Sequence, residues 1–264
     1  SITTQQPDGT SRQTTYAAGR VVEEQILEAS AAVRFQETWL REALTTRALY
    51  TDAAGTRYQP GERDGVPTVL VSPAATPGTE QEYRGSLALA SLQAGRPWTP
   101  PADALLFTYT KTPVRIAGTP YTEARTEPTA LAQSLFTRYA ETQTSTSWLD
   151  AAGQAALTTS VLVDPAGRER TVYTTRAGDR YQPGVREGEP VVFVTAAADP
   201  ATTRTYRGRL DPAALEATLR APTLDLAALW SITTQQPDGT SRQTTYAEGE
   251  VVEETIRAAE TVRF

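Results

Sequence analysis

Apolar positions recur along the chain at a spacing typical of helices and at a spacing typical of strands. Val22, Ile26, Ala29 and Val33 follow one another at intervals of four, three and four residues. This spacing predicts a helix over 19–35 with one apolar face. The related segment 249–264 keeps three of the four positions, so it predicts the same helix near the end of the chain.

A second helix is predicted over 126–141. Thr126 is a candidate N-cap, Pro128 falls in the first turn, and Leu131, Leu135 and Tyr139 form the apolar stripe.

A shorter helix is predicted after Asp211. The pair Asp211 and Pro212 supplies a cap and a first-turn proline, and Leu215 and Leu219 supply the apolar face. The stretch 86–92 has a similar pattern and predicts a matching short helix.

The remaining sequence predicts β-hairpins. Turn residues stand between arms rich in Thr, Val and Tyr in three stretches: TTQQPDGTSRQTTY at 3–16, VLVDPAGRERTVYTT at 161–175 and VFVTAAADPATTRTY at 192–206. The Thr-rich arms alternate weakly, which predicts that one face of each hairpin contacts water.

The chain repeats itself at two offsets. Residues 1–17 are identical to 231–247, an offset of 230, and 55–87 resembles 178–210 at an offset of 123. These matches predict an α+β fold made of tandem units of roughly 115 residues, each with antiparallel β-hairpins plus one or two short helices. We expect 1–35 to be the end of a preceding unit, 36–143 to be one unit, and 144–264 to be a second unit that ends in a copy of 1–35.

The composition lacks several residue types. The 264 residues include no Cys, Met, His or Asn, and Lys111 is the single lysine. A GC-rich coding source and a deliberately designed sequence both account for this bias, and the sequence leaves both interpretations open.

Charge and hydropathy exclude some partners. The net charge of −6 disfavours a nucleic-acid partner, which clustered Lys and Arg would bind. The longest apolar runs, such as 191–198, are much shorter than the roughly 20 residues of a membrane helix, so no membrane-spanning segment is predicted.

The sequence predicts no catalytic, cofactor or metal site, and we expect the protein not to be an enzyme. Nucleophilic triads and zinc sites usually need His or Cys, and the chain has neither. The adjacent carboxylates Glu23 and Glu24 fit a solvated face better than glycosidase chemistry. Single aspartates stand beside turns and fit turn formation better than calcium binding; they are Asp8, Asp52, Asp150, Asp164 and Asp238.

Two short motifs occur once per predicted unit. RYQPG occupies 57–61 and 180–184, and YRG occupies 83–85 and 206–208. A tyrosine under an arginine stem, with Pro-Gly turning the chain, gives these motifs a structural role; Arg with Tyr is also a common pairing at interfaces. The four tryptophans fall near the predicted joints and suit core anchors better than a ligand platform. We therefore predict packing between units by Trp39, Tyr58, Tyr83, Arg84, Trp148, Tyr181, Tyr206, Arg207 and Trp230.

The stretch LVDPAGRERTVYTTRAGDRY at 162–181 resembles the YD-repeat, or Rhs, family. A D-P-x-G turn, a Thr/Tyr strand and an x-A-G turn follow one another, and Gly167 and Gly178 stand eleven residues apart. QPDGTSRQTTYAAGR at 6–20 and SWLDAAGQ at 147–154 are similar, although Ala17 stands where the family has Asp. The resemblance covers about 60 residues and implies a secreted or surface protein of non-catalytic β-hairpins.

These observations favour a structural role. We expect a section of an extracellular tandem-repeat fibre, sheath or adhesin that packs against copies of itself, because each unit would leave an edge for its neighbour to cover. Two alternatives remain: a de novo designed protein without biological function, and a surface module that binds a ligand or glycan.

Overall fold

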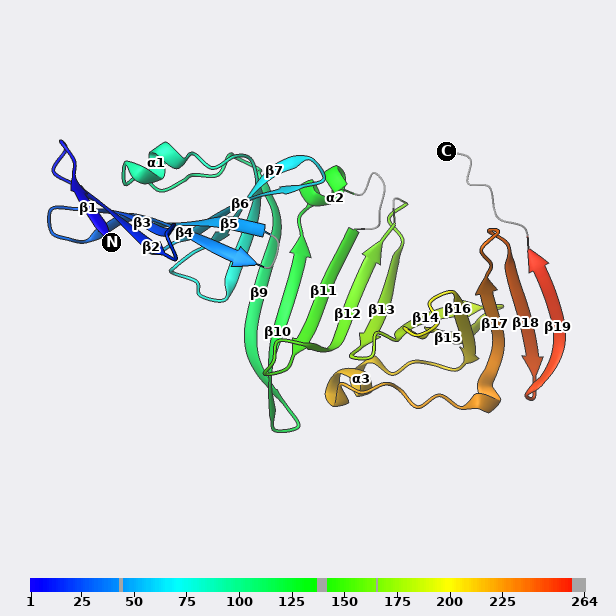
Figure 1. The fold of residues 1–264 in the computed structure, drawn as a ribbon. Helices are drawn as coiled ribbons and strands as arrows, with labels where there is room; N and C mark the ends of the chain where they lie inside the picture. The colour runs from blue at the N-terminus through cyan, green and yellow to red at the C-terminus, as the bar shows by residue number, and fades with distance from the viewer. Residues whose placement is uncertain (43–44, 137–141, 165, 258–264) are drawn as a thin grey trace. The chain divides into compact units, whose positions relative to one another are not determined.

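The protein is mainly antiparallel β-sheet with a few short helices. The computed structural model describes residues 1–42, 45–136, 142–164 and 166–257, and over these residues the chain forms nineteen strands (Figure 1). The chain divides into two compact units. Unit 1 comprises Ser1–Lys111 with Thr126–Tyr139, and unit 2 comprises Thr112–Arg125 with Ala140–Phe264.

Eight strands and two helices lie wholly within unit 1. They are β1 (Ile2–Gln5), β2 (Ser11–Ala17), β3 (Arg20–Leu27), β4 (Val33–Glu42), β5 (Thr45–Asp52), β6 (Arg57–Arg63), β7 (Val66–Ser72), β8 (Thr79–Arg84), α1 (Leu89–Gln93) and α2 (Ala130–Phe136). Strands β9 (Leu105–Ile116) and β10 (Thr119–Pro128) each contribute residues to both units.

The other elements belong to unit 2. They are β11 (Thr142–Leu149), β12 (Ala155–Val163), β13 (Glu169–Thr175), β14 (Arg180–Arg186), β15 (Glu189–Thr195), β16 (Thr202–Arg207), α3 (Pro212–Thr218), the 3-10 turn η1 (Leu226–Ala228), β17 (Leu229–Gln235), β18 (Ser241–Ala247) and β19 (Glu250–Arg257).

Within each unit the strands follow a meander, in which each strand pairs with the next strand of the chain. β1 to β8 pair successively in unit 1, and β11 to β19 do so in unit 2, always antiparallel. The three predicted hairpins are confirmed as β1–β2, β12–β13 and β15–β16.

The helix predicted over 19–35 is wrong. Residues 20–27 form strand β3, and a turn in which the Glu28 N–H donates to the Ala32 carbonyl at 2.8 Å leads into β4. A spacing of four residues is also a multiple of two, so Val22 and Ile26 share one face of a strand as readily as one face of a helix. The apolar residues Val21, Val22 and Ile26 are β-branched, and β3 has a neighbouring strand on each side. Both features favour a strand over a helix. The equivalent prediction near the end fails over 250–257, which form β19, and its residues 258–264 lie outside the described part of the chain.

The helix predicted over 126–141 is shorter than expected. Thr126 and Pro128 belong to β10, and α2 begins at Ala130. The hydroxyl of Thr129 accepts the N–H of Ala132 at 3.4 Å, so Thr129 takes the capping position that the sequence suggested for Thr126. The predicted stripe residue Tyr139 lies outside the described residues.

The two short helices are confirmed. α3 follows Asp211, whose Oδ1 accepts the N–H of Ala214 at 3.2 Å, and Leu215 and Leu219 are buried as predicted. The pattern at 86–92 gives α1, with Leu92 fully buried. Because these helices are so short, the fold contains much less helix than the predicted α+β class.

RYQPG does not turn the chain. Pro60 and Gly61 lie inside β6, and Pro183 and Gly184 lie inside β14. The turn comes after each strand, at Asp64–Gly65 in unit 1, where both residues have positive φ angles of 51° and 76°.

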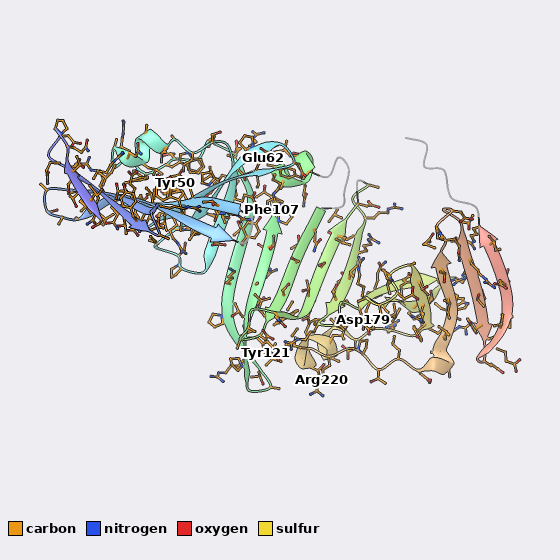
Figure 2. The ribbon with its side chains drawn as sticks, in the orientation of Figure 1. Tyr50, Glu62, Phe107, Tyr121, Asp179 and Arg220 are labelled. Carbon is orange, nitrogen blue, oxygen red and sulfur yellow. The ribbon has the colours of Figure 1, made fainter. Side chains whose placement is uncertain are left out.

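Apolar side chains gather in separate clusters within the units. In unit 1, Phe35 and Val69 pack with Leu92 of α1, and Phe107 on β9 packs beside α2 (Figure 2). In unit 2, Leu157 and Val192 pack with Leu215 of α3. Each helix therefore closes one part of a sheet face that would otherwise contact water.

Candidate functional site

Two of the tyrosines predicted to pack between units lie beside a tryptophan of unit 1. Tyr58 and Tyr83 both meet Trp98 edge-to-face, with ring centroids 6.3 and 5.9 Å apart. The Tyr58 hydroxyl donates to Oδ2 of Asp52 at 2.8 Å, and burial together with this hydrogen bond raises the Tyr58 pKa. Arg84 lies outside this group and is exposed, and its backbone N–H donates to the Ala104 carbonyl.

The corresponding tyrosines of unit 2 are also core residues. Tyr181 and Tyr206 are buried in the cluster that includes Leu215, and Trp148 on β11 packs against that cluster. Trp39 on β4 is half-buried and pairs with Ala48 across β4–β5. These contacts lie inside single units, so a role of these residues between units stays a prediction.

Trp230 is held by two arginines. The guanidinium carbon of Arg186 lies 4.8 Å from the centre of the Trp230 ring, and that of Arg207 lies 4.6 Å from it. Nη1 of Arg186 also donates to the hydroxyl of the fully buried Ser231 at 2.8 Å. The pairing of Arg207 with Trp230 joins two of the predicted residues, whereas no sequence motif singles out Arg186.

A charged cluster in unit 1 joins three strands, and no sequence motif marks it. Glu82 on β8 accepts from Nη2 of Arg63 on β6 at 2.7 Å and from the hydroxyl of Tyr109 on β9 at 2.5 Å. Burial of Glu82 raises its pKa, but the hydrogen bonds from Arg63 and Tyr109 outweigh burial and hold the Glu82 pKa below its usual value. Arg63 also stacks over Phe107 at 4.4 Å.

The chemistry of this cluster is that of a brace. A neighbouring hollow of about 280 Å³ is lined by Glu82 and Tyr109 and by residues of β6 and β7. Both oxygens of the Glu82 carboxylate accept hydrogen bonds, from Arg63 and Tyr109, so the group connects strands β6, β8 and β9. One sequence signal singles out Glu82: the matching segment at an offset of 123 has Thr205 at the equivalent position.

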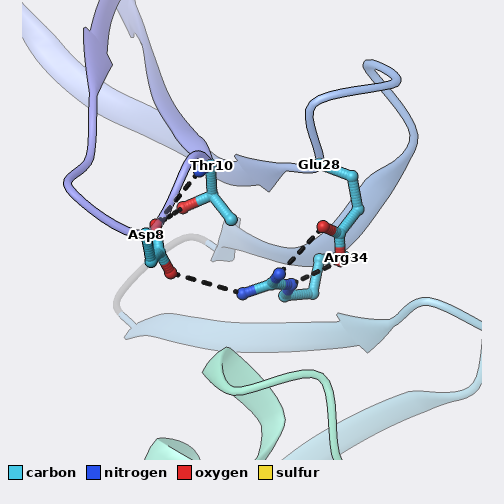
Figure 3. Close-up of polar contacts among 4 residues, drawn as sticks. All are labelled: Asp8, Thr10, Glu28 and Arg34. Carbon is cyan, nitrogen blue, oxygen red and sulfur yellow. Dashed lines mark hydrogen bonds and ion pairs between the residues drawn. The ribbon is translucent and has the colours of Figure 1, made fainter.

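A second ionic group ties together the turns at the start of unit 1 (Figure 3). Arg34, at the start of β4, donates to both carboxylate oxygens of Glu28 at 2.6 and 2.8 Å and lies 3.6 Å from Asp8. The hydrogen bonds from Thr10, followed by Arg34, lower the pKa of Asp8, and the hydrogen bond from Arg34 lowers the pKa of Glu28. Arg34 thereby links the β1–β2 turn to the β3–β4 turn.

The turn aspartates perform the predicted structural role. Oδ1 of Asp150 accepts the N–H groups of Ala152 and Gln154, both at 2.9 Å, and the other turn aspartates make similar contacts. Over the described ranges, no group of three acidic residues is placed to hold a metal ion.

The most exposed apolar strand of the described chain is β19. Val251, Val252 and Ile256 are 60%, 60% and 71% exposed, whereas Val21, Val22 and Ile26, their equivalents in β3, are half-buried. β3 pairs with β2 on one edge and β4 on the other. β19 pairs with β18, and among the described residues no strand ladder covers its second edge. This edge, with Val252 and Ile256, is the strongest candidate for an interaction surface, and we name it the β19 edge.

Comparisons with known proteins leave the family open. No family model matches the chain, and no curated protein sequence matches it. Among solved structures, the TCP10 domain of Danio rerio CPAP, in complex with a peptide of Danio rerio STIL, matches 96% of this chain and 98% of that chain, with 13% identity and a TM-score of 0.25. Within the described residues, none of the helices is both long and apolar enough to span a membrane.

Proposed function

We propose that the protein is a non-catalytic structural section of a tandem-repeat fibre, sheath or adhesin outside the cell, in which each unit pairs with copies of itself. The observation that carries the proposal is the recurrence of identical strand registers. Ile2 pairs with Thr14 in β1–β2, and Ile232 pairs with Thr244 in β17–β18, both 230 residues later.

The recurrence extends to irregular features. A register shift separates Thr15 from Tyr16 in β2, and the same shift separates Thr245 from Tyr246 in β18. Bulges of this kind depend on local sequence and on the neighbouring strand, so their recurrence supports one module used twice.

The shorter offset gives further support. Tyr58 pairs with Val71 in β6–β7, and Tyr181 pairs with Val194 in β14–β15, so both partners shift by 123 (181 − 58 and 194 − 71). A meander of such modules stabilises itself through contacts between neighbours, as solenoid repeats do. The likeness of 162–181 to YD repeats supports a location outside the cell.

Deleting 231–264 tests the proposal. The deletion removes β18, β19 and most of β17, so it uncovers β16 and takes away the strands that would meet a neighbour. We expect it to abolish assembly in sedimentation velocity and negative-stain images and to lower the melting temperature of unit 2.

A shorter deletion, 250–264, is the matched control because it leaves β17 on β16. We expect it to keep the melting temperature while still reducing assembly. If the intact chain stays monomeric at high concentration and the 231–264 deletion melts unchanged, the proposal fails.

A further inference from the structure

We propose that a hollow in unit 2 binds an acidic sugar, a pyranose ring that carries a carboxylate. The hollow has a volume of about 330 Å³ and is formed by strands β13 to β16. Its lining includes Arg180 and Gln182 of β14, Phe193 and Thr195 of β15, and Thr203 of β16. Binding of a sugar goes beyond the proposed structural role, because it does not require assembly.

The hollow lies on the sheet face that points away from the core of unit 2. Tyr181 and Val194 are buried in that core, in the cluster that includes Leu215. Successive side chains of a strand point to opposite faces, so the neighbours of these two residues, Arg180 and Thr195 among them, face the other way. A ligand can therefore enter the hollow without disturbing the core.

Arg180 and two threonines form a row across three strands. Arg180 pairs with Thr195 in β14–β15, and Thr195 pairs with Thr203 in β15–β16. The two threonine hydroxyls lie 3.1 Å apart, so one donates to the other and one O–H remains for a ligand. Arg180 is exposed, and among the described residues it makes no ion pair. A guanidinium binds the two oxygens of a carboxylate well, so this row suits an anion.

The equivalent row of unit 1 carries a negative charge. Arg57, Ser72 and Glu80 occupy the same three positions at an offset of 123 (180 − 57, 195 − 72 and 203 − 80). The Ser72 hydroxyl donates to Oε1 of Glu80 at 3.1 Å, where unit 2 has the hydroxyl pair. Glu80 would repel an anion that approached Arg57. The anion site is therefore expected in unit 2 and not in unit 1.

Phe193 indicates that the anion is attached to a ring. Phe193 is half-buried, and its ring crosses Gly184, where a Cβ atom would lie 2.5 Å from Cε2. Gln182 pairs with Phe193 across β14–β15, and its amide can both donate to and accept from sugar hydroxyls. Ligand sites commonly combine an apolar surface with a few polar groups of this kind. Unit 1 has Leu70 in place of the phenylalanine.

The test is a titration of the intact, isotope-labelled chain with glucuronate at neutral pH, followed by NMR. We expect saturable shifts of the backbone amide signals of Arg180, Thr195 and Thr203, and none at Arg57. Glucose has the ring without the carboxylate, and acetate has the carboxylate without the ring. Each should bind at least about tenfold more weakly than glucuronate, because each loses one part of the contact.

Matched variants of the two rows test the charge. Arg180→Gln should lower the affinity for glucuronate at least about tenfold, whereas Arg57→Gln, the equivalent change in unit 1, should leave it unchanged. Thr203→Glu introduces the residue that unit 1 has and should also lower the affinity at least about tenfold, because the new carboxylate repels the ligand. Unit 1 accommodates Glu80 at the same position, so this variant should fold.

Phe193→Leu tests the ring separately. It introduces the leucine that unit 1 has at position 70, so the strand pairing should persist. The affinity for glucuronate should fall, and the weaker binding of acetate should not change, because only the sugar ring contacts the phenylalanine.

The inference is overturned if glucuronate causes no saturable shift in the intact chain, or if Arg180→Gln and Arg57→Gln bind it equally. Equal binding of glucuronate and acetate would also overturn it, because the hollow would then recognise a bare anion. The titration does not depend on assembly, so a chain that never assembles can still keep this site, and an assembling chain can lack it.

Discussion

At the scale of single residues, burial and hydrogen bonding decide what each charged side chain does. Glu82 is 7% exposed and is bonded to Arg63 and Tyr109, whereas Thr205 occupies its equivalent position and is 3% exposed. Unit 1 thus joins its strands with an ionised brace at a place where unit 2 has a neutral hydroxyl.

Glu82→Gln should lower the free energy of unfolding by about 2 kcal/mol at neutral pH, because Arg63 loses its charged partner. The folded pKa of Glu82 lies below its usual 4.5, so its stabilising effect is present above that value and disappears as the pH falls through the folded pKa. Urea unfolding at about pH 7 and about pH 3.5, followed by tryptophan fluorescence, should show the difference between wild type and variant shrinking in acid.

Thr205→Val is the control for this prediction. It removes a buried hydroxyl and no charge, so its effect should be the same at both pH values. A Glu82→Gln effect that does not change with pH would show that the brace does not depend on the charge of Glu82.

At the scale of elements, the same motif meets different neighbours in the two units. Gly61 in β6 and Gly184 in β14 occupy the last position of RYQPG. A Cβ atom on Gly61 would lie 3.3 Å from Oγ1 of Thr68, and one on Gly184 would lie 2.5 Å from Cε2 of Phe193. Glycine is thus required sterically in β14, where an aromatic ring crosses the strand.

Gly184→Ala should cost about 1–3 kcal/mol of unfolding free energy, because the Phe193 ring must move. Gly61→Ala should be close to neutral, since the gain from a stiffer unfolded chain offsets a small adjustment of Thr68. Thermal unfolding of the two variants compares the sites directly, and equal losses would contradict the steric explanation.

At the scale of the whole molecule, equivalent strands differ in whether a neighbour covers them. β3 is covered by β4, and β19 carries the same apolar positions in exposed form. The difference lies in the surroundings and not in the strand, because Val21, Val22 and Ile26 recur unchanged as Val251, Val252 and Ile256.

Ile26→Ala should therefore lower the free energy of unfolding by about 2 kcal/mol, and Ile256→Ala by less than about 0.5 kcal/mol, in dilute monomer. When the protein assembles, the loss of unfolding free energy caused by Ile256→Ala should rise toward the loss caused by Ile26→Ala, because assembly would bury Ile256. Denaturant unfolding over a range of protein concentrations measures both, and a large cost of Ile256→Ala in dilute monomer would show that β19 is already covered.

Local sequence determined the turns, the caps and the recurrence. Asp150 and its counterparts bond backbone groups two to four residues ahead, and Asp211 caps α3 through Ala214, so these features depend on neighbours in sequence and could be predicted. Identical segments at 1–17 and 231–247 give identical registers for the same reason.

Tertiary structure decided which segments became strands, which side chains paired with Glu82 and which residues were buried. The spacing of Val22 and Ile26 suits both a helix and a strand, and the choice follows from β2 and β4, which supply backbone partners on both edges of β3. The partners of Glu82 come from strands 19 and 27 residues away, beyond the reach of local patterns. The burial of a side chain depends on which strands lie beside its own strand. Ile26 and Ile256 occupy equivalent sequence positions and differ in exposure for this reason.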